Sequence, residues 1–341
     1  MRALVYHGPK DMKIEERPIP QPAAGQVRIR TAFVGICGSD VHGWLGVTGR
    51  RIPPMIMGHE FSGIISALGE GVTGWNVGDP ITVQPMFSCG KCGYCAEGLT
   101  NLCDDRKFMG AMDNNGAFMD EFCVPVENLC ALPENVSLET GALIEPFAVA
   151  YRGILHAGGV KGKTVMICGA GTIGLMALKV CKLLEAGTII VVDLSDDRLE
   201  LARKHGADIT INGREDIGAA LTAAGLRNQI DVAVEAVGVT PTAQQTVEFV
   251  KTRGTIVWIG NSAPTVTVNM QSIVTRELTI YGSYIYTDED FRECIRLLSE
   301  KPQDFTGIIS EVIPVEQAQD AFEELSHGAT AKIKVLVDMR L

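Results

Sequence analysis

The chain has 341 residues, of which 46% are hydrophobic and 21% charged, and its formal net charge is −11. This length and composition predict roughly two ordinary globular domains and exclude a single small module, a coiled coil or a collagen-like fibre. The negative charge is accompanied by no cluster of Lys or Arg. We therefore expect neither a nucleic acid nor a membrane surface as a partner.

The N-terminus and the longest uncharged stretches argue against export and membrane insertion. Six charged side chains in residues 1–16 leave no room for the apolar core of a secretion signal. Residues 254–275 are interrupted by polar residues and proline, and the apolar run from Val165 ends at Lys179. We expect a cytoplasmic protein, whose ten cysteines serve metal binding, catalysis or packing rather than disulfides.

The first part of the chain, residues 1–147, is rich in glycine and proline and carries short β-like segments, which predict a mainly β domain. These segments are residues 26–34, 63–67, 80–84 and 121–126.

From Lys163 onward, strand-like and helix-like segments alternate. Helical patterns cover residues 175–184 and 198–205, and β-like runs cover residues 164–168, 188–192, 209–211, 231–235, 255–259 and 278–282. Alternation of this kind predicts an α/β domain with about six parallel strands.

The C-terminal tail carries two helical patterns, residues 289–299 and 315–325, and a strand-like segment at residues 333–337. These elements are too few to bury a core alone, so we expect them to complete another domain.

A glycine-rich turn follows the strand at residues 164–168 and opens an amphipathic helix. Such a turn brings backbone amides and the positive end of a helix to a pyrophosphate, and Asp193, nineteen residues after Gly174, suits a ribose diol. Because a carboxylate there repels the extra phosphate of NADP, NAD is the expected cofactor. Similar turns also occur without nucleotides. The predicted cofactor-binding residues are Gly169, Gly171, Thr172, Ile173, Gly174, Asp193 and Arg198.

Four cysteines are spaced closely enough to surround one metal ion: Cys89, Cys92, Cys95 and Cys103. Four thiolates favour a structural zinc with no open coordination position. An iron–sulfur cluster is a weaker alternative, because the final gap does not match ferredoxin spacings. The remaining cysteines apart from Cys37 lie in apolar stretches and are assigned to packing: Cys123, Cys130, Cys168, Cys181 and Cys294.

Three further segments hold potential metal ligands. They are Cys37-Gly-Ser39-Asp40-Val-His42, Gly58-His59-Glu60, and Ile144-Glu145-Pro146. Each is weak evidence alone, because a single His or Glu is usually a structural group.

Taken together, these segments resemble the zinc-containing medium-chain alcohol and polyol dehydrogenases, in particular the sorbitol dehydrogenase and galactitol-1-phosphate dehydrogenase branch. The resemblance covers essentially the whole chain. It includes the four-cysteine segment, the glycine-rich turn and the glycine spacing of residues 58–79, all in the family's order.

The resemblance implies a split catalytic domain built on a GroES-like β-barrel, with a doubly wound Rossmann domain inserted in it. The barrel would comprise residues 1–147 and 289–341, and the NAD-binding domain residues 148–288. It also implies an active site between the domains and a homodimer or homotetramer.

The resemblance further implies two zinc ions per chain, one structural and one catalytic. Cys37 and His59 resemble direct ligands of the catalytic zinc, and Glu60 and Glu145 are both candidates for the next position. Ser39 and His42 match the family's proton relay. The implied reaction transfers a hydride from a secondary alcohol to NAD⁺.

The substrate is less clearly implied, although a polyol, a sugar alcohol or its phosphate is the first expectation. Where sorbitol dehydrogenases carry an arginine that contacts hydroxyl groups, this chain has Ile285, which cannot donate a hydrogen bond. A vicinal diol, a sulfonated polyol and a threonine-like amino alcohol therefore stay open, as does a non-catalytic nucleotide-binding role. An anionic substrate could use Arg276 or Arg292.

Overall fold

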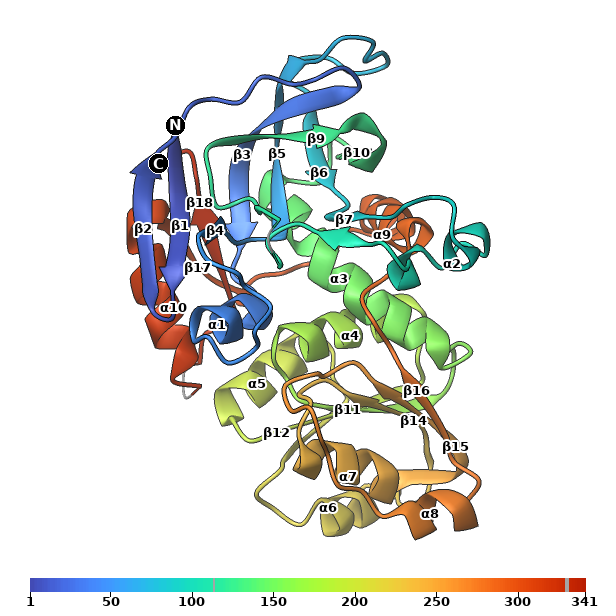
Figure 1. Ribbon diagram of the computed structural model, residues 1–341. Coiled ribbons are helices and arrows are strands. Elements are labelled where there is room, and N and C mark those ends of the chain that lie inside the picture. Colours follow the sequence, from blue (N-terminus) through green and yellow to red (C-terminus); the bar gives the residue numbers. More distant parts are fainter. Residues whose placement is uncertain (113, 329–330) are drawn as a thin grey trace. The chain divides into compact units, whose positions relative to one another are not determined.

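The computed structural model describes residues 1–112, 114–328 and 331–341, which form two compact units (Figure 1). Unit 1 comprises Met1–Glu145 and Thr287–Leu341, and unit 2 comprises Pro146–Tyr286. Helix α3 (Leu138–His156) begins in unit 1 and ends in unit 2. Across the described residues, every helix is too short or too polar to cross a bilayer.

Two β-sheets and a short two-stranded ladder form the framework of unit 1. The larger sheet has the order β10 (Leu129–Ala131), β6 (Pro80–Val83), β5 (Glu60–Leu68), β3 (Gln26–Gly35), β18 (Lys334–Asp338) and β17 (Ile309–Pro314), with β9 (Glu121–Pro125) also paired to β3. The smaller sheet has the order β2 (Asp11–Glu16), β1 (Arg2–Gly8) and β4 (Met55–Ile56), and β7 (Met86–Phe87) pairs with β8 (Lys107–Phe108). Buried apolar residues of both sheets share one core.

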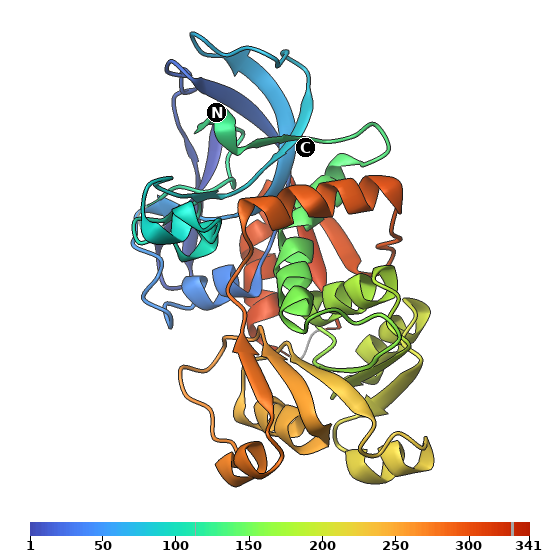
Figure 2. The same cartoon turned by 90° about the vertical axis from the view of Figure 1, so that its right-hand side faces the viewer.

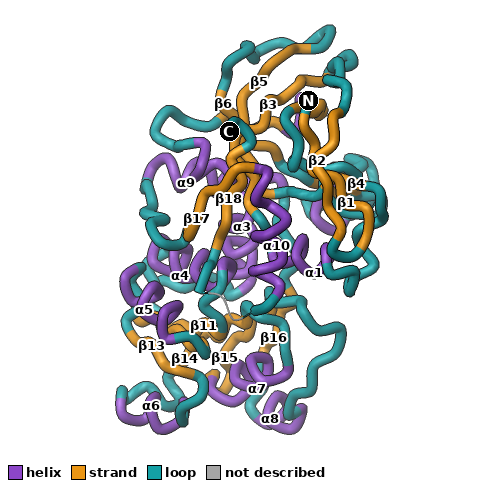
Figure 3. The backbone as a smooth tube through the Cα atoms, turned by 90° about the vertical axis from the view of Figure 1, so that its left-hand side faces the viewer, coloured by secondary structure: helices purple, strands orange, loops and turns teal. Residues whose placement is uncertain are grey.

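The tail is part of this core. Strand β18 runs antiparallel to β3, with Val337 opposite Val34, and parallel to β17, which lies beside it in Figure 3. Helix α10 (Ala318–Ser326) follows β17 and buries Phe322, whose ring lies 6.1 Å from that of Trp44 at the end of α1 (Gly38–Trp44). The tail thus completes a core that begins with the first strand.

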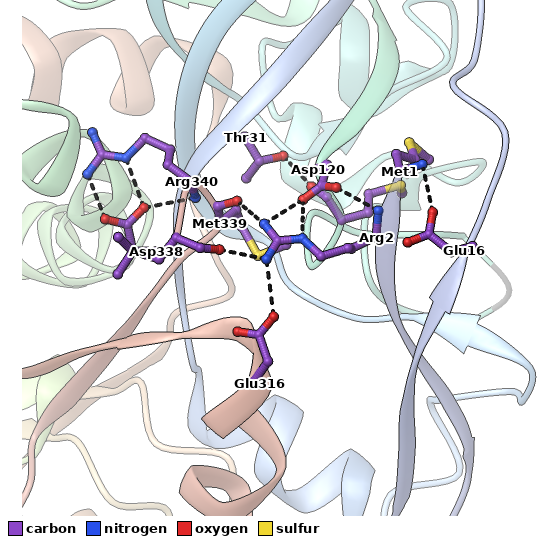
Figure 4. Close-up of polar contacts among 11 residues, drawn as sticks. Met1, Arg2, Glu16, Thr31, Asp120, Glu316, Asp338, Met339 and Arg340 are labelled. Atoms are coloured by element: carbon purple, nitrogen blue, oxygen red, sulfur yellow. Dashed lines mark hydrogen bonds and ion pairs between the residues drawn. The ribbon is translucent and has the colours of Figure 1, made fainter.

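Polar contacts also tie the two ends of the chain together, as Figure 4 shows. Arg2 donates from Nη2 to Asp120 Oδ1 at 3.1 Å and to the carbonyl oxygen of Met339 at 2.7 Å. Its Nη1 reaches Glu316 Oε1 at 3.2 Å. One guanidinium therefore connects β1, the segment before β9 and the tail.

Helix α9 (Asp288–Glu300), the orange-red helix of Figure 2, opens the C-terminal part of unit 1. Hydrogen bonds hold both of its ends. The backbone N–H of Asp288 donates to Thr100 Oγ1 at 3.2 Å, close to the cysteine-rich lobe. At the other end, Asn135 Nδ2 donates to the carbonyl oxygen of Ser299 at 2.8 Å. A capping box of Thr287 and Asp290 fixes the first turn.

Unit 2 is a doubly wound sheet, as expected. Its six parallel strands have the order β13 (Ile209–Asn212), β12 (Thr188–Asp193), β11 (Thr164–Cys168), β14 (Ile230–Glu235), β15 (Val250–Trp258) and β16 (Thr279–Gly282). In Figure 1, α4 (Thr172–Leu183) and α5 (Asp196–Lys204) cover one face, and α6 (Ile217–Ala223) and α7 (Thr240–Phe249) the other. The strand order reverses between β11 and β14, where such folds bind ligands at the carboxyl ends of the strands.

Candidate functional site: a metal centre, a cysteine lobe and a dinucleotide turn

Three potential metal ligands, contributed by two segments of the chain, converge in unit 1. Cys37 precedes α1 in extended conformation, His59 lies between β4 and β5, and Glu60 begins β5. One ligand atom of each lies within 4.8 Å of the other two. A thiolate, an imidazole and a carboxylate together are a donor set that suits zinc, so the residues present fit this metal.

Glu60 is held by a buried lysine. Lys334 Nζ donates to Glu60 Oε2 at 2.5 Å and to the carbonyl oxygen of Ile36 at 2.9 Å. Burial lowers the pKa of Lys334, but the negative charges of Glu60 and Cys37 outweigh it and raise that pKa above its usual value. Gly35, opposite Glu60 in the β3–β5 ladder, leaves room for the carboxylate, because a Cβ there would collide with Oε2.

Glu145 lies outside the group of three that the structure brings within 4.8 Å. It is 5% exposed and lies in the first half of α3, near enough to Lys334 for its charge to raise the lysine pKa. Between the two candidate carboxylates, Glu60 is therefore the one beside Cys37 and His59.

Two charged residues, Asp40 and Arg51, lie next to His59. Asp40 Oδ1 lies 3.5 Å from His59 Nδ1 and accepts a hydrogen bond from Arg51 Nη2 at 2.8 Å. Burial raises the pKa of Asp40, but His59 and Arg51 outweigh it and hold that pKa well below its usual range. Likewise, burial lowers the pKa of His59, but the charges of Asp40 and Cys37 raise it well above its usual value. Such a carboxylate fixes the orientation of a metal-binding imidazole.

The predicted relay residues share the short helix α1 with Asp40. Ser39 Oγ donates to Cys37 Sγ at 3.4 Å and is exposed, and His42 is half-buried in the last turn. Phe108 of β8 packs against His59, with 5.3 Å between the centroids of the two rings. Trp44, the last residue of α1, is only 1% exposed and belongs to the apolar core of unit 1.

The four-cysteine segment folds into a compact lobe around α2 (Gly93–Ala96). One sulfur atom from each of Cys89, Cys92, Cys95 and Cys103 lies within 4.8 Å of the others. Hydrogen bonds from the backbone N–H groups of Asp104 and Cys95 lower the pKa of Cys92 to about 6. Because the four sulfur atoms lie this close together, the lobe is suited to hold a tetrahedral zinc ion.

The glycine-rich turn of unit 2 connects β11 to α4 and requires glycine at two of its positions. Gly169 has a φ of 104°, and a Cβ on Gly174 would collide with the carbonyl oxygen of Gly169. Gly171 precedes α4, whose first turn contains Thr172 and Ile173. The positive end of this helix can receive a pyrophosphate.

Asp193 ends β12 beside this turn. Its carboxylate accepts hydrogen bonds from the backbone N–H groups of Ala170 at 2.6 Å and Ser195 at 2.9 Å. Arg198 lies in the first turn of α5, and its backbone N–H donates to Ser195 Oγ at 3.4 Å. The acid therefore lies at the edge of the sheet where a dinucleotide is expected.

Arg51 and Lys334 were absent from the predicted site. A lysine inside the apolar strand-like segment 333–337 is a signal that could have identified Lys334, because a lone buried charge needs a partner. Arg51 lies in a polar loop, where no pattern distinguishes it from a surface arginine.

Comparisons with known proteins agree with these features. Residues 23–134 match the model of the alcohol dehydrogenase GroES-like domain, and residues 172–300 that of the zinc-binding dehydrogenases. The sorbitol dehydrogenase of Bacillus subtilis is 35% identical, over 99% of this chain and 97% of its own.

Two solved Escherichia coli structures superimpose on the chain with TM-scores of 0.92. One is galactitol-1-phosphate dehydrogenase, 29% identical over 99% of this chain and 100% of its own. The other is a short chain alcohol dehydrogenase in complex with NADH, 31% identical over 99% of both chains.

Proposed function

The chain belongs to the zinc-binding dehydrogenases with an alcohol dehydrogenase GroES-like domain, and from this premise we propose that it oxidises a secondary alcohol group of a polyol, a sugar alcohol or a sugar-alcohol phosphate with NAD⁺. The observation that carries the proposal is the convergence of Cys37, His59 and Glu60. The names of the relatives, sorbitol dehydrogenase and galactitol-1-phosphate dehydrogenase, support the substrate class.

Cys37, His59 and Glu60 hold the catalytic zinc in this proposal. Glu60, which is paired with Lys334 through Oε2, would offer its carboxylate to the metal. Glu145, near the same lysine, acts on the centre through water or exchanges with Glu60. Cys89, Cys92, Cys95 and Cys103 hold a second zinc, so that each chain carries two.

When bound, zinc supplies a Lewis acid that lowers the pKa of a substrate alcohol. Ser39 Oγ, 3.4 Å from Cys37 Sγ, would take up the alcohol proton as its own proton passes to the imidazole of His42, which would release a proton to solvent. Asp40 keeps the ring of His59 oriented by facing its Nδ1. When bound, NAD⁺ would supply the acceptor for the hydride of the same carbon.

NAD rather than NADP is the proposed cofactor. The carboxylate of Asp193 lies beside the turn of Gly169, Gly171 and Gly174, and repels a phosphate on the adenosine ribose. The side chains and amides of Thr172, Ile173 and Arg198 complete the proposed binding site.

The proposal includes a cytoplasmic homo-oligomer. The ten cysteines, all among the described residues, form no disulfide, and a reducing compartment favours this state. Strand β16 ends the sheet of unit 2, and Tyr281 on it is 43% exposed. An edge strand of this kind can pair with a second copy. Light scattering that gives the mass of a monomer would contradict this part of the proposal.

The test is a panel of polyols, their phosphates and sulfonates, vicinal diols and hydroxy-amino acids, assayed for NADH formation. Ile285, which cannot donate a hydrogen bond and has a φ of 41°, is the reason for including diols and amino alcohols. We expect turnover with one class, loss of activity on chelation and recovery with zinc. Absence of turnover with every class would favour a non-catalytic nucleotide-binding role.

Cys37→Ser separates chemistry from cofactor binding. We expect it to abolish turnover and to leave NADH binding, followed by fluorescence titration, unchanged. Cys123→Ser, in β9 and outside both metal-binding groups, is the matched control and keeps its activity. Turnover in Cys37→Ser at the wild-type rate would remove the catalytic zinc from this site.

A further inference from the structure

Arg51 is a buried arginine in the loop between α1 and β4. Its side chain is 5% exposed, and the neighbouring backbone is fixed by Met112. Ile52 N–H donates to the carbonyl oxygen of Met112 at 3.0 Å, and Met112 N–H to that of Arg50 at 2.8 Å. A charged side chain that is buried and fixed in this way needs a specific partner.

Gly43 shapes the path of this side chain. A Cβ on Gly43 would collide with Cγ of Arg51 and lie 3.4 Å from its Cδ. The aliphatic stem of Arg51 therefore packs on α1 at Gly43, and its guanidinium reaches the first turn of the same helix.

In that first turn the guanidinium meets two groups of the metal centre. Arg51 Nη2 donates to Asp40 Oδ1 at 2.8 Å and lies 3.5 Å from Ser39 Oγ. The same Oδ1 of Asp40 faces His59 Nδ1. One oxygen atom thus lies between the guanidinium and the imidazole.

The charge of Asp40 explains why this contact matters. Asp40 is completely buried, and a buried carboxylate is costly without a cationic partner. An imidazole binds metal in its neutral form, so His59 cannot supply that partner in the zinc-bound enzyme. Arg51, which is always charged, can.

We propose that Arg51 is a positioning residue of the catalytic metal centre, which holds Asp40 against His59 and lies beside the hydroxyl of Ser39. The inference rests on the proposed catalytic zinc at Cys37, His59 and Glu60. Arg51 touches none of the reacting atoms and acts through Asp40 and Ser39.

The test measures zinc affinity in chelator-buffered solutions for wild type, Cys37→Ser and Arg51→Met. Cys37→Ser shows which of the two zinc-binding transitions belongs to the catalytic site, because this variant should bind one zinc ion whereas wild type binds two. For Arg51→Met we expect the catalytic-site affinity to fall by about 10–100-fold, with the affinity of the cysteine lobe unchanged. We also expect kcat to fall by a similar factor while the KM for NAD stays constant.

Two further variants make the result specific. Gly43→Ala keeps the charge but crowds the stem of Arg51, so it should weaken the catalytic-site zinc in the same direction, and it serves as the test if Arg51→Met does not fold. Arg28→Met is the matched control, because Arg28 on β3 forms an ion pair with Glu121 at 2.7 Å outside the metal centre. It should leave both zinc affinities unchanged.

The outcomes separate the two proposals. Equal zinc stoichiometry in wild type and Cys37→Ser would overturn the catalytic zinc itself. Equal catalytic-site affinity and kcat in wild type and Arg51→Met would overturn the role of Arg51 alone. A loss of affinity in Arg28→Met as large as in Arg51→Met would also overturn it, because the effect would then be a general loosening of the fold.

Discussion

Lys334 and Glu60 form a buried ion pair, with 2.5 Å between Nζ and Oε2 and both side chains only 2% exposed. The two residues are 274 positions apart in the chain. Because Glu60 is also beside Cys37 and His59, this pair links the C-terminal tail directly to the metal centre. The tail is thus needed for the site as well as for the core.

Lys334→Met should therefore destabilise the protein strongly. Removing one partner of a buried pair leaves an uncompensated charge, and we expect the free energy of unfolding to fall by about 3–5 kcal/mol in urea titrations. Lys332→Met is the control two residues away. Lys332 is 29% exposed and pairs with Glu311 and Glu324, so its loss should cost about 1 kcal/mol or less. Similar losses in the two variants would contradict this account.

Asp193→Ala should raise the KM for NAD and relax discrimination against NADP, because a carboxylate that repels the extra phosphate is lost. Initial rates with both cofactors give the ratio of kcat/KM values. Asp208→Ala is the control, since Asp208 accepts a hydrogen bond from Ile189 N–H at 2.7 Å, near the start of β12, whereas Asp193 lies at its end. An unchanged cofactor ratio in Asp193→Ala would move the specificity determinant elsewhere.

Cys103→Ser should lower the melting temperature and make the cysteine lobe sensitive to proteolysis. A zinc ion present at 100 times its dissociation constant stabilises the folded state by about 2.7 kcal/mol, and this contribution is lost with the fourth ligand. Cys181→Ser provides the comparison, because it also changes a fully buried sulfur but lies in α4, away from the lobe. If both variants melt alike, the lobe does not depend on metal.

The stability of unit 2 should depend on pH through Asp231. Burial raises the pKa of Asp231, but its hydrogen bonds with Lys251 and Thr164 outweigh this and lower it below the usual value. The stabilisation is therefore present above the unfolded-state pKa of about 3.9 and is lost as the pH falls through the lower folded-state pKa.

Asp231→Asn should flatten this acid dependence, measured by urea unfolding between about pH 2 and pH 5. Glu215→Gln, at an exposed position of unit 2, should retain the wild-type slope. An equally steep acid loss in Asp231→Asn would assign the dependence to other carboxylates.

The sequence predicts unit 2 well because its strands are continuous apolar runs flanked by turns. The segment 164–168, for example, coincides with β11. Helix α3 was not predicted, since Gly141 and Pro146 interrupt its apolar pattern. Strand β17 was also missed, because its exposed charged residues hide the alternation.

The candidate site likewise has parts that the sequence predicts and parts that it does not. The glycine turn and the cysteine lobe are local in sequence, so spacing alone predicts them. The contacts of Arg51 with Asp40 and of Lys334 with Glu60 depend on tertiary packing between distant segments, and no short-range pattern encodes them.

The central claim is that Cys37, His59 and Glu60 hold a metal ion. Anomalous scattering at the zinc edge from crystals of the zinc-loaded enzyme tests it most directly. We predict two peaks per chain, one in the cysteine lobe and one at about 2.0–2.3 Å from the ligand atoms of Cys37, His59 and Glu60. A single peak confined to the lobe would contradict the claim.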